Sequence, residues 1–177
     1  MMRKILLLSA LLVPLASMGM AAGEEKPKDK KTSKNCWGAR VWDETSRRCV
    51  KPKESGFSDE QLYDAVRDLA YAGRFIDAQG VLDAMSDQDG YRVLTYRGFT
   101  TRRLGDIELA NAYYRQAIKV NPNGFLARSY MGQGFAEAGD KVAAIEQLRE
   151  IQARGGAGTW AEQSLIAAIE TGKGYNF

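Results

Sequence analysis

Two cysteines, Cys36 and Cys49, carry the chemistry that the sequence predicts most directly. They are too few to hold zinc without histidine partners, and their spacing is not that of a Cys-x-x-Cys redox pair. In an oxidising compartment they are expected to pair, and closing so short a loop stabilises a chain by on the order of 3 kcal/mol. The sequence therefore predicts a structural disulfide rather than a reactive thiol.

The chain contains no histidine among its 177 residues. This absence removes the commonest general base, the commonest zinc ligand and every catalytic triad built on imidazole. No nucleophile, base or metal cluster can be assembled from the remaining residues, so we expect a protein that is not an enzyme and that uses no metal and no cofactor. The net charge is +3, but residues 57–177 hold thirteen Lys and Arg against sixteen Asp and Glu. This mildly acidic balance argues against nucleic acid as a partner.

The N-terminal residues have the layout of a secretory signal peptide over 1–21. Basic residues precede an apolar run over 5–16, and small residues lead to an expected cleavage after Ala21, with Ala22 as the neighbouring alternative. An uncleaved membrane anchor is less favoured, because the apolar run is too short to span a bilayer. We expect a periplasmic or secreted protein with no integral membrane segment after cleavage. Residues 22–35 are rich in lysine and should form a flexible linker; a basic arm for anionic lipid or glycan is the alternative.

A small hairpin bracketed by the disulfide is expected over 36–56. Residues 39–42 have the composition of a strand, and Asp43 suits the first position of a turn. Trp37 and Trp42 are expected to cover the bridge or to dock on the elements that follow, because so small a unit is short of other apolar mass. In the alternative, these tryptophans and the neighbouring arginines form a face that stacks on sugars or docks a protein.

After this hairpin the sequence repeats itself with a period of 32 to 34 residues. A glycine begins each repeated stretch, an alanine follows five positions later, and a large apolar or aromatic residue follows four positions after the alanine. These are Gly73, Ala78 and Leu82; Gly105, Ala110 and Tyr114; and Gly139, Ala144 and Leu148. The pattern predicts a helix, a tight turn with glycine in the left-handed conformation, and a second helix whose alanine lets the pair cross closely. Most of the stability should reside in these helix pairs rather than in the hairpin.

The repeats resemble the tetratricopeptide repeat, which has Gly and Tyr in its first helix, Ala and an aromatic in its second, and Pro at its end. The third repeat keeps Gly132 and Phe135, and the second keeps Gly98 but has Thr101 in place of the aromatic. The last repeat is similar to that of small periplasmic members of the family from proteobacteria. The resemblance implies an all-α fold, a right-handed α-solenoid of three helix pairs with a C-terminal capping helix. The repeats are placed at 59–90, 91–124 and 125–158, and the capping helix at 159–172, within a domain over 57–177.

Helix starts agree with this division. Ser58 with Gln61, and Thr159 with Glu162, each have the spacing of a capping box. A repeat array needs a terminal cap, because each repeat leaves an apolar face for the next. The residues expected on the buried side of that cap are Trp160, Leu165, Ile166 and Ile169.

The resemblance also implies a site, because the family lines a concave groove with side chains of its first helices and binds extended peptides there. Carried over to this sequence, the groove residues are Tyr63, Arg67, Tyr71, Arg92, Thr95, Phe99, Arg102, Arg103, Ser129, Gln133 and Glu137. Arg102 and Arg103 are expected to project into solvent. The groove arginines favour an acidic protein or peptide of the cell envelope as the partner. Alternatively, they are only a solvated helix face, and the aromatics pack between helices.

The leading functional hypothesis is therefore a non-enzymatic scaffold that binds proteins or peptides in its groove. The second hypothesis is a cell-wall or glycan-associated protein that binds through the tryptophan-containing hairpin.

Overall fold

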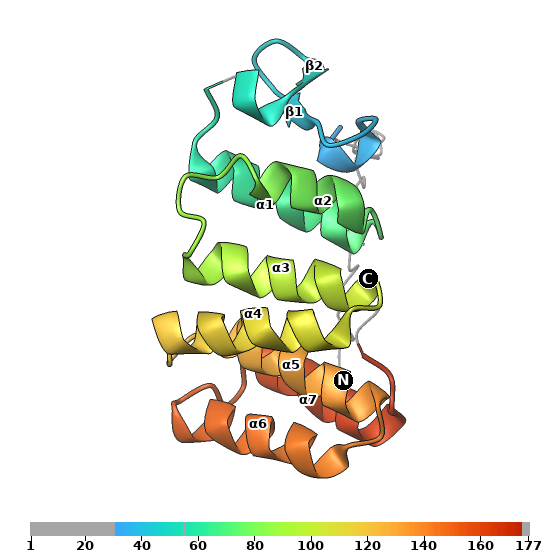
Figure 1. The fold of residues 1–177 in the computed structure, drawn as a ribbon, viewed down its shortest axis with the longest axis vertical. Helices are drawn as coiled ribbons and strands as arrows, with labels where there is room; N and C mark the ends of the chain where they lie inside the picture. Colours follow the sequence, from blue (N-terminus) through green and yellow to red (C-terminus); the bar gives the residue numbers. More distant parts are fainter. Residues whose placement is uncertain (1–30, 55, 175–177) are drawn as a thin grey trace, which may run out of the picture. The chain divides into compact units, whose positions relative to one another are not determined.

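Residues 31–54 and 56–174 are the part of the chain that the computed structural model describes, and they belong to one compact unit. The expected signal peptide, and residues 22–30 of the expected linker, lie outside these ranges. Within them, seven α-helices follow a small two-stranded sheet (Figure 1). The prediction of a mostly helical fold with a small hairpin is confirmed. No helix in the described ranges is long and apolar enough to cross a membrane.

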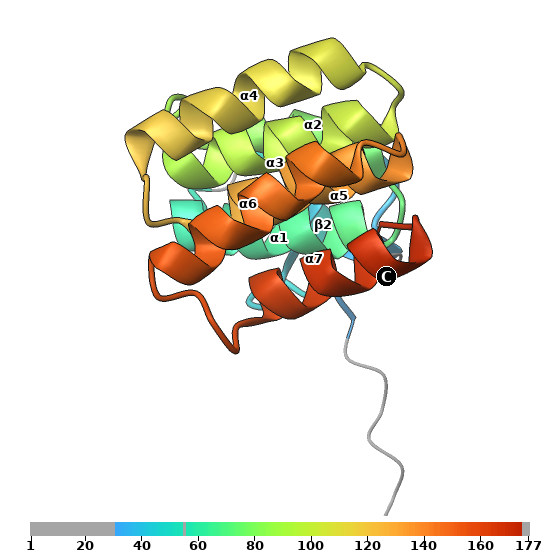
Figure 2. The same cartoon turned by 90° about the horizontal axis from the view of Figure 1, so that it is seen from below.

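The helices follow the sequence period. The first pair is α1 (Asp59–Tyr71) and α2 (Phe75–Leu82), the second is α3 (Tyr91–Arg103) and α4 (Ile107–Val120), and the third is α5 (Phe125–Glu137) and α6 (Lys141–Ala153); α7 (Trp160–Thr171) comes last. The two helices of each pair pack on each other, and α7 packs on both α5 and α6. Figure 2 shows α2 and α4 on one side and α7 on the other, with α3 and α5 between them.

The expected turns and close crossings are present in all three pairs. The φ angles are +76° at Gly73, +102° at Gly105 and +81° at Gly139, a region that costs other L-residues roughly 1–2 kcal/mol. The repeated alanines of the second helices are fully buried, and they are Ala78, Ala110 and Ala144. Glycine is therefore required after each first helix, and alanine allows the second helix to approach.

A glycine inside α3 explains how closely the second pair is packed. A Cβ atom added to Gly98 would lie 2.5 Å from Cε1 of Tyr114 in α4, closer than van der Waals contact permits. Gly132 in α5 plays a similar part, since a Cβ there would lie 2.8 Å from Cδ1 of Leu165 in α7. Tyr114 and Leu165 are fully buried, so they fill the space that the glycines leave.

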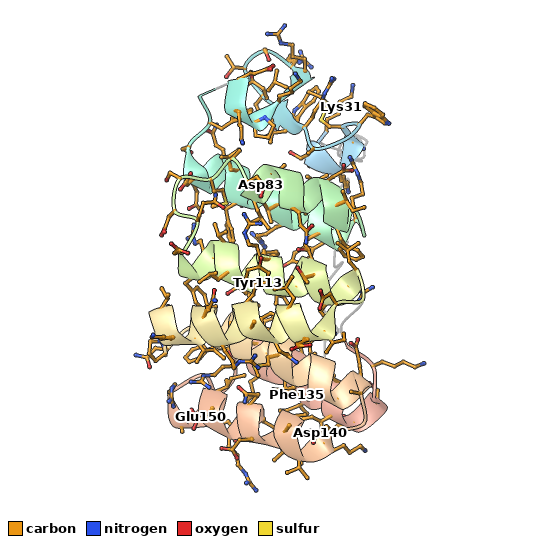
Figure 3. All side chains as sticks on the ribbon, viewed as in Figure 1. Lys31, Asp83, Tyr113, Phe135, Asp140 and Glu150 are labelled. Carbon is orange, nitrogen blue, oxygen red and sulfur yellow. A yellow bond between two sulfur atoms is a disulfide. The ribbon has the colours of Figure 1, made fainter. Side chains whose placement is uncertain are left out.

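Ion pairs join neighbouring helices. Arg97 Nη2 in α3 lies 2.9 Å from Oδ1 of Asp83, which caps the C-terminal end of α2, and Arg128 Nη2 in α5 lies 3.4 Å from Glu150 Oε2 in α6. Both acidic residues are labelled in Figure 3. Burial lowers the pKa of Arg128 and Glu150 opposes this shift, so the pair offsets part of the cost of placing that arginine inside.

The disulfide and the hairpin are confirmed. Cys36 and Cys49 are bonded, and β1 (Val41–Asp43) pairs antiparallel with β2 (Arg48–Val50). Asp43 opens the turn as expected, because its Oδ1 accepts from the Thr45 amide at 2.9 Å and its Oδ2 accepts from Ser46 Oγ at 2.6 Å. A 3₁₀ turn, η2 (Pro52–Glu54), follows the second strand.

The chain is ordered earlier than expected. A second 3₁₀ turn, η1 (Ser33–Asn35), lies inside the stretch predicted as flexible linker. Ser33 is buried there, and its amide donates to Asp68 Oδ2 in α1 at 3.2 Å. The Lys-rich composition did not reveal this contact because its partner lies 35 residues away along the chain.

Arg74, just before α2, fastens the disulfide segment to the helices. Its guanidinium donates to the carbonyl oxygens of Lys34, Cys36 and Gly38, at 3.0 Å for Lys34 and 2.8 Å for Gly38. It also pairs with Asp77 Oδ2 at 2.5 Å. One partly buried charge is thus satisfied by three carbonyls and a carboxylate, which makes Arg74 the main polar anchor of the hairpin.

Two of the three tryptophans, Trp37 and Trp160, are more exposed than predicted. Trp37 is 85 % exposed and neither covers the disulfide nor docks on a helix. Trp42 is half-buried, with Lys31 Nζ 5.4 Å from its ring centroid. Trp160 was expected on the buried side of the last helix, but it is 39 % exposed, whereas Leu165 is fully buried. Val41, rather than a tryptophan, is the hairpin residue that enters the apolar core with α1.

One of the two capping boxes is confirmed. Ser58 Oγ accepts from the Gln61 amide at 3.3 Å, and Gln61 Oε1 accepts from the Ser58 amide at 3.0 Å. At α7 only the first half forms: Thr159 Oγ1 accepts from the Glu162 amide, but the Thr159 amide donates to the Gly156 carbonyl. Glu162 instead accepts from the Gly158 amide, which pulls its carboxylate one residue further from the helix.

Candidate functional site

One face of α1 presents two tyrosines with an arginine between them. Tyr63, Arg67 and Tyr71 are spaced four residues apart, so they lie in a row on one side of the helix. The Arg67 guanidinium carbon lies 6.0 Å from the Tyr63 ring centroid and 5.8 Å from that of Tyr71. A hydrogen bond with Tyr71 raises the pKa of Arg67 above its ordinary value despite partial burial. Arg67 is therefore a fixed cation over an aromatic surface.

The adjacent face of α3 continues this surface. The Arg92 guanidinium carbon lies 4.5 Å from the Tyr63 ring centroid, and Arg92 also pairs with Glu60. The Tyr63 ring packs edge-on against Tyr96, with centroids 5.5 Å apart. Cation–π and edge-to-face contacts of this kind hold the rings in position before any ligand arrives. We call this surface, made of Tyr63, Arg67, Tyr71, Arg92, Phe75, Phe99 and Arg103, the arginine–tyrosine face.

Three tyrosine hydroxyls from three helices meet behind this face. Tyr71 Oη lies 2.6 Å from Tyr96 Oη and 3.3 Å from Tyr130 Oη, and so links α1, α3 and α5. Tyr96 and Tyr130 are fully buried. Burial raises the pKa of both phenols well above 10. The two buried phenols are therefore neutral, and the hydroxyl contacts tie the three helices together.

A pocket opens at one end of the arginine–tyrosine face. Its volume is about 520 Å³, and its lining is Ala70, Tyr71, Ala72, Gly73, Phe75, Phe99 and Arg103. The Arg103 guanidinium carbon lies 5.3 Å from the Phe75 ring centroid, which places a cation beside an aromatic wall. Apolar walls with a small number of fixed polar groups are typical of sites that bind small ligands or single side chains.

Several predicted groove residues are buried instead of accessible. Thr95 is fully buried, and its hydroxyl donates to the Tyr91 carbonyl of its own helix. Gln133 donates to Ser129 Oγ at 3.1 Å and to Ser164 Oγ of α7 at 3.3 Å. Ser129 and Gln133 lie where α7 packs on α5, and Thr95 is buried within α3. Whether any of the carried-over residues contacts a partner stays a prediction.

Arg102 is also misplaced by the prediction. Its side chain is 2 % exposed and pairs with Glu137 of α5 rather than projecting into solvent. Glycine at position 134 gives it room, since a Cβ there would lie 2.9 Å from Arg102 Cδ. Phe99 is buried too and forms only a small part of the pocket wall. Of the two adjacent arginines, Arg102 and Arg103, only Arg103 lines the pocket.

Sequence reasoning missed two of the tyrosines and one pocket residue. Tyr96 and Tyr130 lie at the positions that Tyr63 occupies in the first repeat, 33 and then 34 residues further on, so the period itself could have found them. Phe75 belongs to the turn triplet of the first repeat, where Ile107 and Lys141 stand in the others. An aromatic residue stands at this position only in the first repeat, and that difference could have indicated a distinct role for Phe75.

The described ranges contain no group of three or more acidic or cysteine side chains arranged to hold a metal ion. The chemistry that this site offers is recognition by aromatic packing and fixed positive charge.

Comparison with protein-family models, curated proteins and solved structures finds no match for this chain.

Proposed function

We propose that the three helix pairs and α7 form a right-handed solenoid of the tetratricopeptide type. The proposal is supported by the recurrence of the same local chemistry at one period: a left-handed glycine after each first helix and a buried alanine in each second helix. It is also supported by the close approaches at Gly98 and Gly132, the glycines that the family pattern requires. In this arrangement α7 is the cap of the third pair.

On this fold we propose a non-enzymatic scaffold that binds an extended peptide or protein segment on the arginine–tyrosine face. The observation that supports it most is that Arg67 and Arg92, both exposed, are held over tyrosine rings beside an aromatic pocket. Fixed cations attract acidic groups over distance, and pre-positioned rings bind apolar side chains with little loss of conformational entropy. The partner should therefore carry an acidic group next to an aromatic or large apolar residue.

We place this activity in the periplasm or outside the cell. The Cys36–Cys49 disulfide supports an oxidising compartment, because such bonds are rare in reducing ones. A protein of the cell envelope is the corresponding partner class.

Charge reversal on the face tests the function. Partners are first captured by cross-linking in the native cell. The double variant Arg67→Glu with Arg92→Glu should then bind them at least tenfold more weakly, with the wild-type association rate falling steeply as salt is raised. The matched control is Arg115→Glu with Arg149→Glu, which makes the same charge change at exposed positions of α4 and α6. Equal affinity of both double variants for every partner would refute a binding role for this face.

A second candidate function is supported by Trp37. An 85 % exposed tryptophan is unusual, and it lines a depression of about 490 Å³ with Asn35, Cys36, Gly38, Arg74 and Asp77. Tryptophan beside polar groups is suited to stacking on a sugar ring, so association with the cell wall or a glycan is the alternative. Trp37→Ala removes this surface without touching the core. Loss of binding in this variant alone favours the glycan function, whereas loss only in the arginine variant favours the scaffold.

A further inference from the structure

We propose that the disulfide hairpin docks the protein on a surface of anionic phospholipid. In this arrangement the hairpin cations contact lipid phosphates, and Trp37 enters the boundary between headgroups and acyl chains. The residues concerned lie outside the arginine–tyrosine face, so the proposal does not depend on the proposed scaffold function.

Positive charge is concentrated at one end of the fold. Residues 31–54 contain seven Lys and Arg against three Asp and Glu, a net charge of +4, whereas residues 56–174 contain thirteen against sixteen, a net charge of −3. Figure 1 shows the hairpin beyond α1, at the end of the row of helices. An anionic surface attracts this end and repels the remainder, so it orients the protein with the hairpin toward the surface.

Three of the hairpin cations line a hollow of about 510 Å³, and they are Arg40, Arg48 and Lys51. Asp43 and Glu54 also line it, but both carboxylates already have partners. Asp43 accepts the two hydrogen bonds that form the turn, and Glu54 Oε1 lies 3.0 Å from Lys51 Nζ. The lining keeps one net positive charge, and guanidinium groups match the oxygens of a phosphate in geometry.

A further cation, Arg47, is held at the turn in a backbone conformation that favours glycine. Its φ is +52°, and within the described ranges it is the one residue other than glycine with a positive φ. In this region Cβ lies too close to a carbonyl oxygen. The side chain is exposed, so its burial does not compensate for the strain. Strained residues of this kind cluster at sites that contact ligands, which fits a cation presented at the tip of the hairpin.

Trp37 favours a lipid surface over a soluble polyanion as the partner. It is 85 % exposed and follows Cys36, whereas Arg48 precedes Cys49. The Cα atoms of the two cysteines are 5.6 Å apart, so the ring and a pocket arginine start from neighbouring parts of the backbone. Tryptophan is enriched at membrane–water interfaces, where its ring is in apolar surroundings and its N–H stays hydrated.

Vesicle binding tests the proposal. The purified full chain is mixed with vesicles of equal amounts of phosphatidylcholine and phosphatidylglycerol, and the bound fraction is measured by sedimentation. Arg40→Ala with Arg48→Ala should weaken binding about tenfold or more, because each cation near an anionic surface strengthens binding about fivefold. The matched control, Arg115→Ala with Arg149→Ala, removes the same charge from exposed positions of α4 and α6. It should weaken binding less than about twofold, since salt screens charges that lie far from the surface.

Two further measurements separate binding from structure. Asparagine tolerates the left-handed conformation, so Arg47→Asn should leave the exchange of the hairpin amides no faster than in the wild type. Its vesicle binding should nevertheless fall about fivefold. In a protein that carries Trp42→Phe and Trp160→Phe, emission from Trp37 should move to shorter wavelength on the vesicles and stay unchanged with inorganic phosphate.

Equal losses in the two double variants would overturn the proposal, because the charge of the whole protein would then drive binding. So would undiminished binding by Arg47→Asn, or equal binding to vesicles of phosphatidylcholine alone. Emission from Trp37 that stays at long wavelength on the anionic vesicles would also overturn it, since the hairpin would then recognise phosphate or another polyanion without entering a lipid layer.

Discussion

Arg102 in α3 donates through Nη1 to Glu137 Oε2 in α5, with one partner buried and the other partly in water. The Arg102 side chain is 2 % exposed and that of Glu137 is 36 % exposed. Two other polar atoms of Arg102, Nε and Nη2, are buried and make no hydrogen bond within the described residues. Glu137 therefore provides most of the compensation for a desolvated charge that joins the second and third helix pairs.

Removing that carboxylate should destabilise the fold. Breaking a fully buried pair costs about 3–5 kcal/mol, and because Glu137 is partly solvated we expect about 2 kcal/mol for Glu137→Ala. Urea unfolding followed by circular dichroism measures the change. Glu146→Ala removes an exposed surface pair with Arg149 and should change the stability by less than about 0.5 kcal/mol. Adding Arg102→Met to Glu137→Ala should recover part of the loss, and a further loss instead would show that Arg102 is stabilised by something else.

The buried tyrosines predict that the folded state loses stability at alkaline pH. Tyr96, Tyr114 and Tyr130 are fully buried. Burial raises the pKa of Tyr114 to about 12, and it raises those of Tyr96 and Tyr130 further. In the unfolded chain these groups lose a proton near pH 10, so above that pH the unfolded state binds fewer protons and stability falls. The slope should be about 1.4 kcal/mol per pH unit for each tyrosine, or about 4 kcal/mol for the three.

Absorbance at 295 nm checks this directly. At pH 11 the native protein should show phenolate from only part of its eight tyrosines, with the remainder appearing on unfolding. Complete ionisation of the folded protein at that pH would contradict the burial.

Because α3 and α4 cross closely at Gly98, a methyl group added there should lower the stability of the fold. Gly98→Ala should cost about 1–3 kcal/mol, because its Cβ would overlap the Tyr114 ring. Tyr114→Leu should reduce that cost when the two changes are combined, which a double-mutant cycle would reveal. Gln116→Ala, exposed on α4, is the control. If Gly98→Ala is neutral, the helices can move apart freely and the crossing is not close-packed.

Truncation inside the second helices should have unequal effects. Tyr114→Ala should cost about 3–5 kcal/mol, because the residue is fully buried. Leu148 occupies the equivalent place in α6 but is only half-buried, so Leu148→Ala should cost clearly less. Thermal denaturation of the two variants makes the comparison, and equal losses would mean that exposure at this position does not control the cost.

The disulfide predicts a local response to reduction. Intact mass should show both thiols absent in protein isolated without a reducing agent. After reduction, amides over 36–50 should exchange faster with solvent, while the circular dichroism signal of the helices remains. The segment should stay attached to the helices, because Arg74 still donates to the Cys36 and Gly38 carbonyls. Arg74→Ala combined with reduction should release the segment. Loss of helical signal on reduction alone would show that the helices depend on the bridge.

Much of the helical part could be predicted because its signals are local and repeated. The turn glycines, the crossing alanines and the disulfide each depend on neighbours within a few residues or on an obvious pairing. The candidate site could be predicted only in part, since the exposure of Ser129 and Gln133 depends on where α7 packs, and local sequence does not determine that packing. The contact between Ser33 and Asp68 was likewise invisible, because nothing in a lysine-rich stretch identifies a partner in α1.

The placement of the three tryptophans gives the protein its own optical probes. Trp37 and Trp42 belong to the disulfide segment, and Trp160 begins α7, with its ring centroid 6.1 Å from that of Tyr130. Emission from the exposed Trp37 should lie at long wavelength and respond to sugars or to reduction, whereas Trp160 should respond to events near the tyrosine hydroxyls. Single-tryptophan variants would therefore report separately on the two surfaces that the competing functions use, without any attached dye.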